Sequence, residues 1–279
     1  MQKKLAAALL ACSAASPAIA ELVKSRALVD LSLEQLANIT VSSVSRRDEP
    51  LALAPASVYV ITAEDIRRSG ATSLPEALRL APNLQVARAD ANQYAISARG
   101  FNNTLANKLL VLIDGRTVYT PLFSGTFWEA QDVLLEDIER IEVISGPGAM
   151  LWGANAVNGV INIITRSATD TQGTMATLGG GTQDKQLGLR YGGQTAGANY
   201  RVYAKAARRD ATTLGNDRGE HVQVGFRADW TRPGGERFTL QGDGYGGEAQ
   251  GQGREFEGLN LLGRWTRDLG EGAQLKQQA

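Results

Sequence analysis

The residue types that carry most enzyme chemistry are scarce in this 279-residue chain. It holds one cysteine, Cys12, and one histidine, His221. A structural zinc site, a disulfide framework and most cysteine- or histidine-based catalysis are therefore excluded. The acids that could do proton-transfer chemistry are Asp114, Asp132, Glu136, Asp137, Glu139 and Glu142. A hairpin turn and solvated helix faces explain their positions, so the sequence predicts no catalytic constellation.

One glycine-rich segment invites comparison with a phosphate-binding loop. Its glycines, Gly146, Gly148 and Gly153, have the spacing G-x-G-x-x-x-x-G. This is neither the dinucleotide fingerprint nor a P-loop, and no Gly-Lys-Ser/Thr follows. Pro147 also removes one of the N–H donors that such a loop would use. We interpret the segment as a tight turn that leads into a strand over residues 157–165.

A short segment near the N-terminus could bind a partner through its backbone. Residues 39–44 are rich in β-branched side chains, which favour an extended backbone. A polar stretch that ends at Pro50 follows. Two interpretations stay open: an ordinary edge strand, or a free strand that adds to the edge of a partner's sheet.

Charge and the first residues narrow the class of protein. The 29 Lys and Arg residues balance 29 Asp and Glu residues, whereas nucleic-acid-binding domains carry a basic surplus. We therefore expect no nucleic acid as a partner. Lys3 and Lys4 precede an apolar stretch at residues 5–15, and a small–x–small pattern follows at residues 18–20. This order predicts an export signal peptide over residues 1–20, cleaved before Glu21.

The glycine content divides the remaining chain near residue 170. The part before this point predicts a small α/β domain. Thr62 is a predicted N-cap of a helix that ends at Gly70, and Ser73-Leu74-Pro75-Glu76 predicts a capping box for a second helix. Asp114-Gly115 predicts a hairpin turn.

The part after residue 172 holds 23 of the 31 glycines and alternates with a period of two. Val222, Val224 and Phe226 alternate with Gln223 and Arg227, for example. We count six or seven strands of about ten residues, the length and dyad pattern of outer-membrane barrel strands. A soluble β-sandwich shares this alternation. The signal peptide, the strand length and the glycine content favour the membrane.

Several motifs match a known family. Residues 58–166 resemble the plug domain of TonB-dependent outer-membrane receptors. The most specific motif is the long one at residues 152–166. One departure is Ser145, because many members have an arginine at this place. The matching motifs are Ile96-Ser97-Ala98-Arg99-Gly100-Phe101, Val111-Leu112-Ile113-Asp114-Gly115-Arg116, Ile138-Glu139-Arg140-Ile141-Glu142-Val143, Gly146-Pro147 and Trp152-Gly153-Ala154-Asn155-Ala156-Val157-Asn158-Gly159-Val160-Ile161-Asn162-Ile163-Ile164-Thr165-Arg166.

The resemblance implies an α+β plug domain followed by antiparallel transmembrane strands of a 22-stranded barrel. It implies a signal peptide over residues 1–20, a periplasmic tether over 21–50, a plug over 51–170 and the first barrel strands over 171–279. The tether would hold the TonB box, whose residues are Ile39, Thr40, Val41, Ser42 and Ser43.

The resemblance also implies the function. Such a receptor lies in the outer membrane of a Gram-negative bacterium and contacts its lipid. It takes up a scarce small-molecule ligand, such as a ferric siderophore, another metal chelate or cobalamin. TonB and its inner-membrane energising complex supply the work. The protein would be no enzyme and would need no cofactor and no metal site of its own.

The size of the second part limits this interpretation. At about 15 residues per strand and turn, 22 strands need about 330 residues, and residues 173–279 supply 107. We therefore expect an N-terminal fragment of a receptor. The alternatives are a stand-alone plug-type binding module or a non-functional truncated receptor. A signalling receptor is not expected, because its extra domain of about 80 residues would precede the box.

The plug motifs separate into structural residues and candidate ligand contacts. Loops carry recognition while a scaffold positions them, so the ligand contacts are expected in two apical loops. The aromatic residues of the second loop could instead pack against the barrel wall. The candidate contacts are Asn102, Asn103, Tyr119, Phe123, Phe127 and Trp128. The structural residues are Arg99, Gly100, Asp114, Gly115, Arg140, Glu142, Gly146, Pro147, Gly153 and Gly159.

Overall fold

The structure is a computed structural model of the chain. It describes residues 39–44, 49–100, 102–105, 107–146, 149–195, 197–210, 217–249, 253–270 and 273–279. The predicted signal peptide and the motif residues Phe101 and Pro147 lie outside these ranges. Within them, no helix is long and apolar enough to cross a membrane.

The first domain, here called the plug (residues 49–171), is built on a five-stranded sheet in the order β3-β10-β11-β6-β7. The interior strand β10 pairs antiparallel with β3 and with β11, whereas β11 and β6 run parallel. The strands of this sheet are β3 (Ser57–Thr62), β6 (Leu109–Ile113), β7 (Arg116–Thr117), β10 (Ile138–Ser145) and β11 (Gly159–Thr165).

Short elements complete the plug around this sheet. Three two-stranded pairings join β1 to β2, β4 to β5 and β8 to β9. These strands are β1 (Thr40–Val41), β2 (Glu49–Pro50), β4 (Leu84–Arg88), β5 (Tyr94–Ala98), β8 (Tyr119–Thr120) and β9 (Gly125–Thr126). The helices are α2 (Ala63–Ser69), α3 (Leu74–Leu78) and α4 (Ala149–Trp152), with 3₁₀ turns η2 (Leu51–Leu53), η3 (Leu135–Asp137) and η4 (Thr169–Thr171).

Local sequence signals explain where the first helix begins and ends. The Asp65 N–H donates to Thr62 Oγ1 over 3.2 Å, and the Thr62 N–H donates to Asp65 Oδ2 over 3.0 Å. Gly70 ends α2 in the left-handed conformation, with φ +69°. The predicted cap and terminal glycine of this helix are therefore confirmed.

The capping box predicted for the second helix is wrong. Helix α3 forms, but the Ser73 side chain makes no cap hydrogen bond. Glu76 is engaged elsewhere, because it accepts from Arg79 Nε over 2.6 Å and from the Tyr94 hydroxyl over 2.8 Å. Packing fixes this helix instead, since Leu74, Ala77 and Leu78 are fully buried.

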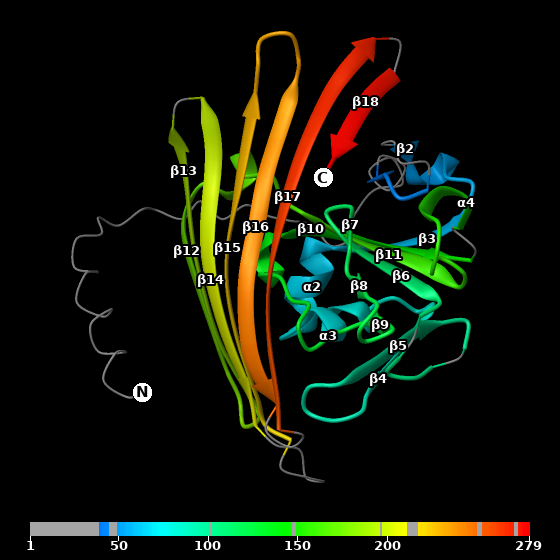
Figure 1. Cartoon of the computed structure of the whole chain (residues 1–279), viewed down its shortest axis with the longest axis vertical. Coiled ribbons are helices and arrows are strands. Elements are labelled where there is room, and N and C mark those ends of the chain that lie inside the picture. The colour runs from blue at the N-terminus through cyan, green and yellow to red at the C-terminus, as the bar shows by residue number, and fades with distance from the viewer. Residues whose placement is uncertain are drawn as a thin grey trace, which may run out of the picture.

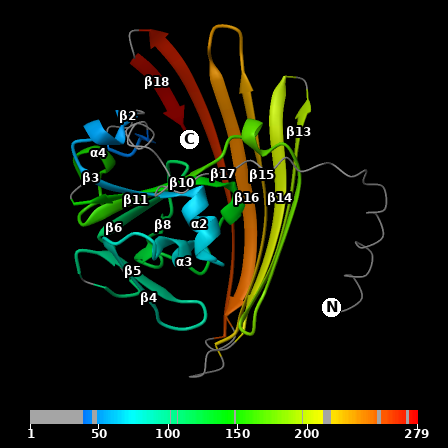
Figure 2. The same ribbon diagram turned by 180° about the vertical axis from the view of Figure 1, so that it is seen from behind.

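Residues 173–278 form a seven-stranded antiparallel sheet, here called the long sheet, in sequence order from β12 to β18. It stands beside the plug and curves around it (Figure 1). Seen from behind, α2 and α3 lie on the side of the plug that faces this sheet (Figure 2). The strands are β12 (Gly173–Gly180), β13 (Asp184–Thr195), β14 (Ala198–Arg209), β15 (Gly219–Thr231), β16 (Arg237–Ala249), β17 (Arg254–Gly270) and β18 (Ala273–Gln278). The two edge strands do not pair with each other, so the sheet is open.

The predicted alternation of the long sheet is confirmed. Val222 and Val224 are 55% and 56% exposed on the outer face, whereas Gln223 is 2% exposed on the face that meets the plug. Leu262 departs from the alternation, because it is apolar at an inward position. It is 2% exposed, so the plug covers it. The outer face is thus apolar and uncovered, and the inner face is polar and covered by the plug.

Gly159 provides a test of how tightly the plug sheet is packed. A Cβ at this position would lie 2.5 Å from the Ile144 carbonyl oxygen and 3.3 Å from Leu109 Cδ1. Gly159→Ala should therefore lower the free energy of unfolding by about 1–3 kcal/mol, as overpacking does. Gly263→Ala is the control, because a Cβ there meets nothing within 4 Å. Thermal unfolding of both variants measures the difference, and equal stability would contradict the packing argument.

Candidate coupling site and plug–sheet interface

The N-terminal segment (residues 39–44) lies on the plug. Its two-residue strand β1 pairs with β2, and the Leu51 N–H donates to the Ile39 carbonyl over 2.7 Å. Val41 is fully buried, and Val44 packs in a small apolar cluster with Leu110 and Ile144. Of the two interpretations of this segment, the structure shows a short edge strand that is docked on its own chain.

A single carboxylate holds the middle of this segment. Glu142 accepts the Ser42 N–H over 3.0 Å and the Ser43 N–H over 2.8 Å. Its side chain is fully buried. Two further bonds fix Ser43: Trp152 Nε1 donates to its carbonyl over 2.7 Å, and Asn162 Nδ2 donates to its hydroxyl over 2.9 Å.

The plug sheet places the groups that surround Glu142. Arg140 and Glu142 are two residues apart on β10 and share a face because side chains alternate along a strand. Arg140 Nε donates to Glu142 Oε1 over 2.8 Å and supplies the counter-charge. Asn162 lies directly opposite Glu142 on β11. The site is therefore built on the rigid centre of the sheet, while the segment that it binds lies at the periphery.

This arrangement holds a peptide segment on the plug through hydrogen bonds to a buried carboxylate. A hydrogen bond to a charged group contributes about 1.5–3 kcal/mol, and Glu142 makes two to backbone N–H groups. The described part of the chain contains no group of three or more His, Cys, Asp or Glu side chains that could hold a metal ion.

A second set of buried carboxylates joins the plug to the long sheet. Asp137 pairs with Arg190 and, at 3.3 Å, with Arg201. Asp132 pairs with Lys205 at 2.6 Å, and Lys205 Nζ also donates to the Val133 carbonyl over 3.0 Å. Each pair has one partner on the plug and one on the long sheet, so these pairs fix the position of the plug.

Asp114 adds a third attachment at the tip of a hairpin. It sits in a left-handed conformation with φ 50° and accepts the Thr165 N–H over 2.9 Å. Gln241 Nε2 donates to Asp114 Oδ2 over 2.9 Å, and Arg264 donates to the Asp114 carbonyl. Gly115 follows with φ +79° and completes the predicted turn.

The expectation of solvated helix faces is wrong for Asp132, Asp137 and Glu142, while Asp114 lies in the predicted hairpin turn but is buried there. Asp114, Asp137 and Glu142 are at most 7% exposed, and the Asp132 side chain is 12% exposed. Apart from Arg140 beside Glu142, the partners described above are 51 to 150 residues away in the sequence. The row of cations at inward positions of the alternating strands could have predicted that plug acids are buried against them. Arg201, Lys205 and Arg227 belong to this row.

The remaining motif residues lie in turns and close contacts. Arg99 and Gly100 have positive φ values of 58° and 91° after β5, and Gly146 has φ 108°. Gly153 has φ 79° after α4. These positions need a left-handed backbone, which glycine adopts without strain. These motif residues thus shape the turns of the plug, whereas Glu142, Trp152 and Asn162 bind the N-terminal segment.

The residues expected to contact a ligand lie in different environments. Asn102 and Asn103 are exposed, while Trp128 is 8% exposed and belongs to the plug core. Phe127 packs edge-on against Phe256 of β17, with ring centroids 5.6 Å apart. Part of the second loop therefore packs on the wall.

The exposed part of that loop is its tip. Phe123 packs on Phe127 at 4.9 Å and, like Tyr119, is half-buried. Leu122 is fully exposed, and Ser124 has φ 57°. This tip leaves apolar surface open to solvent at the end of β8.

Comparison with known proteins places these features in a family. Residues 50–160 match the family model of the TonB-dependent Receptor Plug Domain. The chain is 34% identical over 167 residues to the vitamin B12 transporter BtuB of Vibrio vulnificus, a match that covers 59% of this chain and 26% of that protein. A second BtuB, from Photobacterium profundum, is 34% identical over 162 residues, covering 57% of this chain and 25% of that protein.

Solved structures show the same fold. The ferripyoverdine receptor of the outer membrane of Pseudomonas aeruginosa superposes with a TM-score of 0.70 at 17% identity, covering 86% of this chain and 35% of the receptor. Residues 50–160 therefore form a plug domain of the TonB-dependent receptor type. The chain consists of a plug and an open set of antiparallel strands of the barrel type. It spans about a quarter of the length of the curated relatives it matches.

Glu142 is the residue to change to test what holds the N-terminal segment. Glu142→Gln keeps the size of the side chain but weakens its bonds to the Ser42 and Ser43 N–H groups, because they lose their charge. We expect residues 39–44 to become accessible to proteases. A spin label attached at position 40 should report greater mobility of the segment. Glu139→Gln is the matched control, because Glu139 also pairs with Arg140 but is about half exposed. Equal protease accessibility in both variants would show that Glu142 does not hold the N-terminal segment on the plug.

The pKa values of two plug acids give a second test. Burial disfavours ionisation of Asp132, but Lys205, His221 and Arg209 together more than offset this, so the pKa of Asp132 is held below its usual 3.8. Burial raises the pKa of Glu129, although Arg254 pairs with it at 2.7 Å. The Asp132 contribution to stability is thus complete at neutral pH and is lost as the pH falls below about 4.

Asp132→Asn should lower the free energy of unfolding at pH 7 by about 3 kcal/mol, because it leaves a buried ammonium without its partner. The difference from the unaltered protein should shrink as the pH is lowered toward 3. Glu129→Gln should cost much less, because burial already favours the neutral form of that group. Thermal unfolding between pH 3 and 7 measures both. A constant Asp132→Asn deficit over this range would contradict the assignment.

Proposed function

We propose that the chain belongs to an outer-membrane receptor that imports a scarce ligand and is energised through TonB. TonB binds the N-terminal segment as an added strand and pulls on the plug. The receptor binds its ligand on the outer side and moves it without covalent chemistry. Its box consists of Ile39, Thr40, Val41, Ser42 and Ser43.

The observation that carries this proposal is the way in which the box is held. Strand addition uses the backbone N–H and C=O groups of the added strand. In the docked segment, Glu142 occupies the N–H groups of Ser42 and Ser43. TonB and Glu142 therefore compete for the same donors, and the segment must leave the plug before TonB can bind it fully.

The position of Glu142 gives this competition a mechanical consequence. It lies on β10, which is hydrogen-bonded on both sides, to β3 and to β11. Removing the segment takes the Ser42 and Ser43 N–H donors away from Glu142 and leaves Arg140 as its remaining charged partner. Because each hydrogen bond to a charged group contributes about 1.5–3 kcal/mol, release removes stabilising contacts from β10. A pull on the tether is thereby transmitted to the core of the domain.

The relatives support the class of ligand. The curated relatives are named as transporters of vitamin B12, and the superposed receptor was solved with ferripyoverdine. We propose a ligand of this kind, a cobalamin or a ferric siderophore. The exposed loop tip at residues 119–124 and the exposed Asn102 and Asn103 are the proposed ligand contacts.

The outer face of the long sheet supports a membrane location. Leu178 and Leu259 are 86% and 85% exposed, and Leu261 is 63% exposed. In water such a surface is unfavourable at about 25 cal/mol per Å² of apolar area, whereas lipid acyl chains cover it. We propose that this face contacts outer-membrane lipid and that residues 1–20 are the export signal. A stand-alone binding module would instead appear in the soluble periplasmic fraction.

Thr40 is the best position at which to test strand addition, because its side chain is exposed. Thr40→Pro removes an N–H donor and should abolish energised uptake of cyanocobalamin or a ferric siderophore, while binding at the cell surface remains. Thr40→Ala keeps the N–H group and should leave uptake within about twofold. Surface binding and uptake are measured in the same cells. Normal uptake by Thr40→Pro would exclude this segment as the box.

A further inference from the structure

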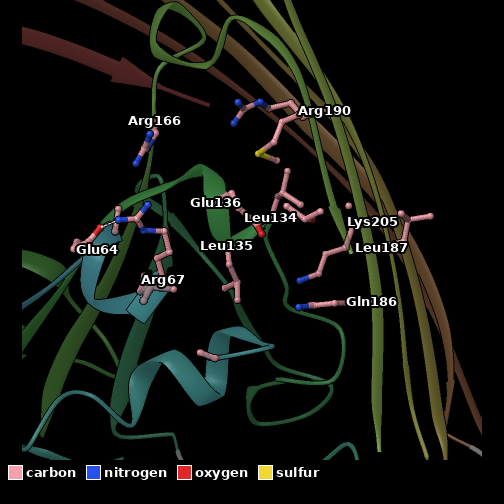
Figure 3. A pocket seen from close by; sticks show the side chains of 16 residues that line it. Glu64, Arg67, Leu134, Leu135, Glu136, Arg166, Gln186, Leu187, Arg190 and Lys205 are labelled. Atoms are coloured by element: carbon pink, nitrogen blue, oxygen red, sulfur yellow. Dashed lines mark hydrogen bonds and ion pairs between the residues drawn. The ribbon is translucent and has the colours of Figure 1, made fainter. Parts of the chain in front are cut away.

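A cavity of 440 Å³ lies between the plug and the edge of the long sheet. Helix α2 and η3 form its plug side, and β12 and β13 form its wall. Arg190, Lys205 and Gln186 reach from the wall toward the plug, and Arg166 approaches from the end of the plug (Figure 3). The cavity belongs to neither the box site nor the loop tips.

Cations outnumber acids among the residues that line this cavity. The charged lining residues are Arg67, Arg166, Arg190, Lys205, Glu64 and Glu136. On the plug side, Asp137 of η3 pairs with Arg190 and Arg201, and Asp132 pairs with Lys205. Arg166 is the lining cation that no acid of the described residues pairs with. Glu64 is shared, since Arg67 and Arg68 both bind it, at 2.5 and 2.8 Å.

Several polar groups of the cavity have unused capacity. Among the described residues, the Arg166 guanidinium and the Gln186 amide form no ion pair or hydrogen bond with another side chain. Arg190 Nε is buried and has no hydrogen-bond acceptor. Donors without acceptors in a partly buried, cationic site are the complement of an anion, because guanidinium groups bind carboxylate and phosphate oxygens with charge-assisted bonds.

We propose that this cavity binds the carboxylate or phosphate group of an organic anion, and that the receptor's cargo carries such a group. The inference rests on the proposed uptake function, because it assigns the cavity to the ligand that the receptor imports. The volume exceeds that of a single inorganic anion and accommodates part of a larger molecule. The wall side is held in place by the ion pairs of Arg190 and Lys205 with the plug.

Binding is tested on the native outer-membrane protein in detergent, by titration with citrate, with inorganic phosphate and with neutral glycerol. We expect citrate or phosphate to bind, with an affinity that falls as salt rises, and glycerol not to bind. Arg166→Gln should weaken anion binding about tenfold, the loss expected for one charge-assisted bond. Gln186→Glu should weaken it further, because it places a like charge in the cavity. The anion that binds more tightly identifies the group that is recognised.

Arg232→Gln is the matched control, because Arg232 lies in the turn after β15, away from the cavity. It should leave anion binding unchanged. Absence of binding by both anions, or equal binding by Arg166→Gln and the control, would overturn the inference.

Uptake measured in the same variants separates the two proposals. We expect Arg166→Gln to slow energised uptake about tenfold while surface binding stays unchanged. Uptake at the normal rate in Arg166→Gln would overturn the role of the cavity in transport but would leave TonB-coupled uptake standing. Anion binding in a protein that shows no energised uptake of any ligand would overturn the proposed function alone.

Discussion

A carboxylate that is buried must be neutralised by its own chain, and this requirement organises the molecule. Glu142 meets it with Arg140 and with two backbone N–H groups of the N-terminal segment. Asp132 and Asp137 meet it with cations of the long sheet. The cost of an uncompensated buried charge thus keeps the segment on the plug and the plug against the wall. Without these acids, an apolar sheet domain and a curved wall would have few reasons to adopt one relative position.

The plug–sheet attachment and the attachment of the N-terminal segment differ in strength, and the difference determines which of them breaks first under a pull. The plug–sheet pairs join full charges of η3 and the loop before it to full charges of the long sheet, and breaking one costs about 3–5 kcal/mol. The bonds that Glu142 makes to the segment join one charge to neutral N–H groups, at about 1.5–3 kcal/mol each. A pull at the N-terminus therefore detaches the segment first and leaves the plug seated. The cationic cavity beside Arg190 and Lys205 lies next to the stronger attachment, so an anion bound there competes with Asp137 and Asp132 for their cations.

The sequence predicted what local patterns determine. The Thr62 cap, the Gly70 terminus and the inward and outward faces of the long strands follow from neighbouring residues and were confirmed. The roles of Asp132, Asp137 and Glu142 could not be found in this way. Their partners lie far away in the sequence, and a carboxylate in a turn has the same local pattern whether it is solvated or buried. Ser73 shows the converse, because its capping box is correct locally but Tyr94 and Arg79 bind Glu76 instead. Trp128 was predicted to lie in an apical loop, but its side chain packs in the plug core.

The central claim is that Glu142 and TonB compete for the same backbone donors. The affinity of the purified periplasmic domain of TonB for the ligand-free protein, with and without Glu142→Gln, tests it most directly. If docking on Glu142 leaves only a fraction of the segment available, the apparent Kd equals the intrinsic Kd divided by that fraction. The loss of one charge-assisted bond should then tighten binding by Glu142→Gln about tenfold, while Glu139→Gln stays at the original value. Equal or weaker binding by Glu142→Gln would contradict the account.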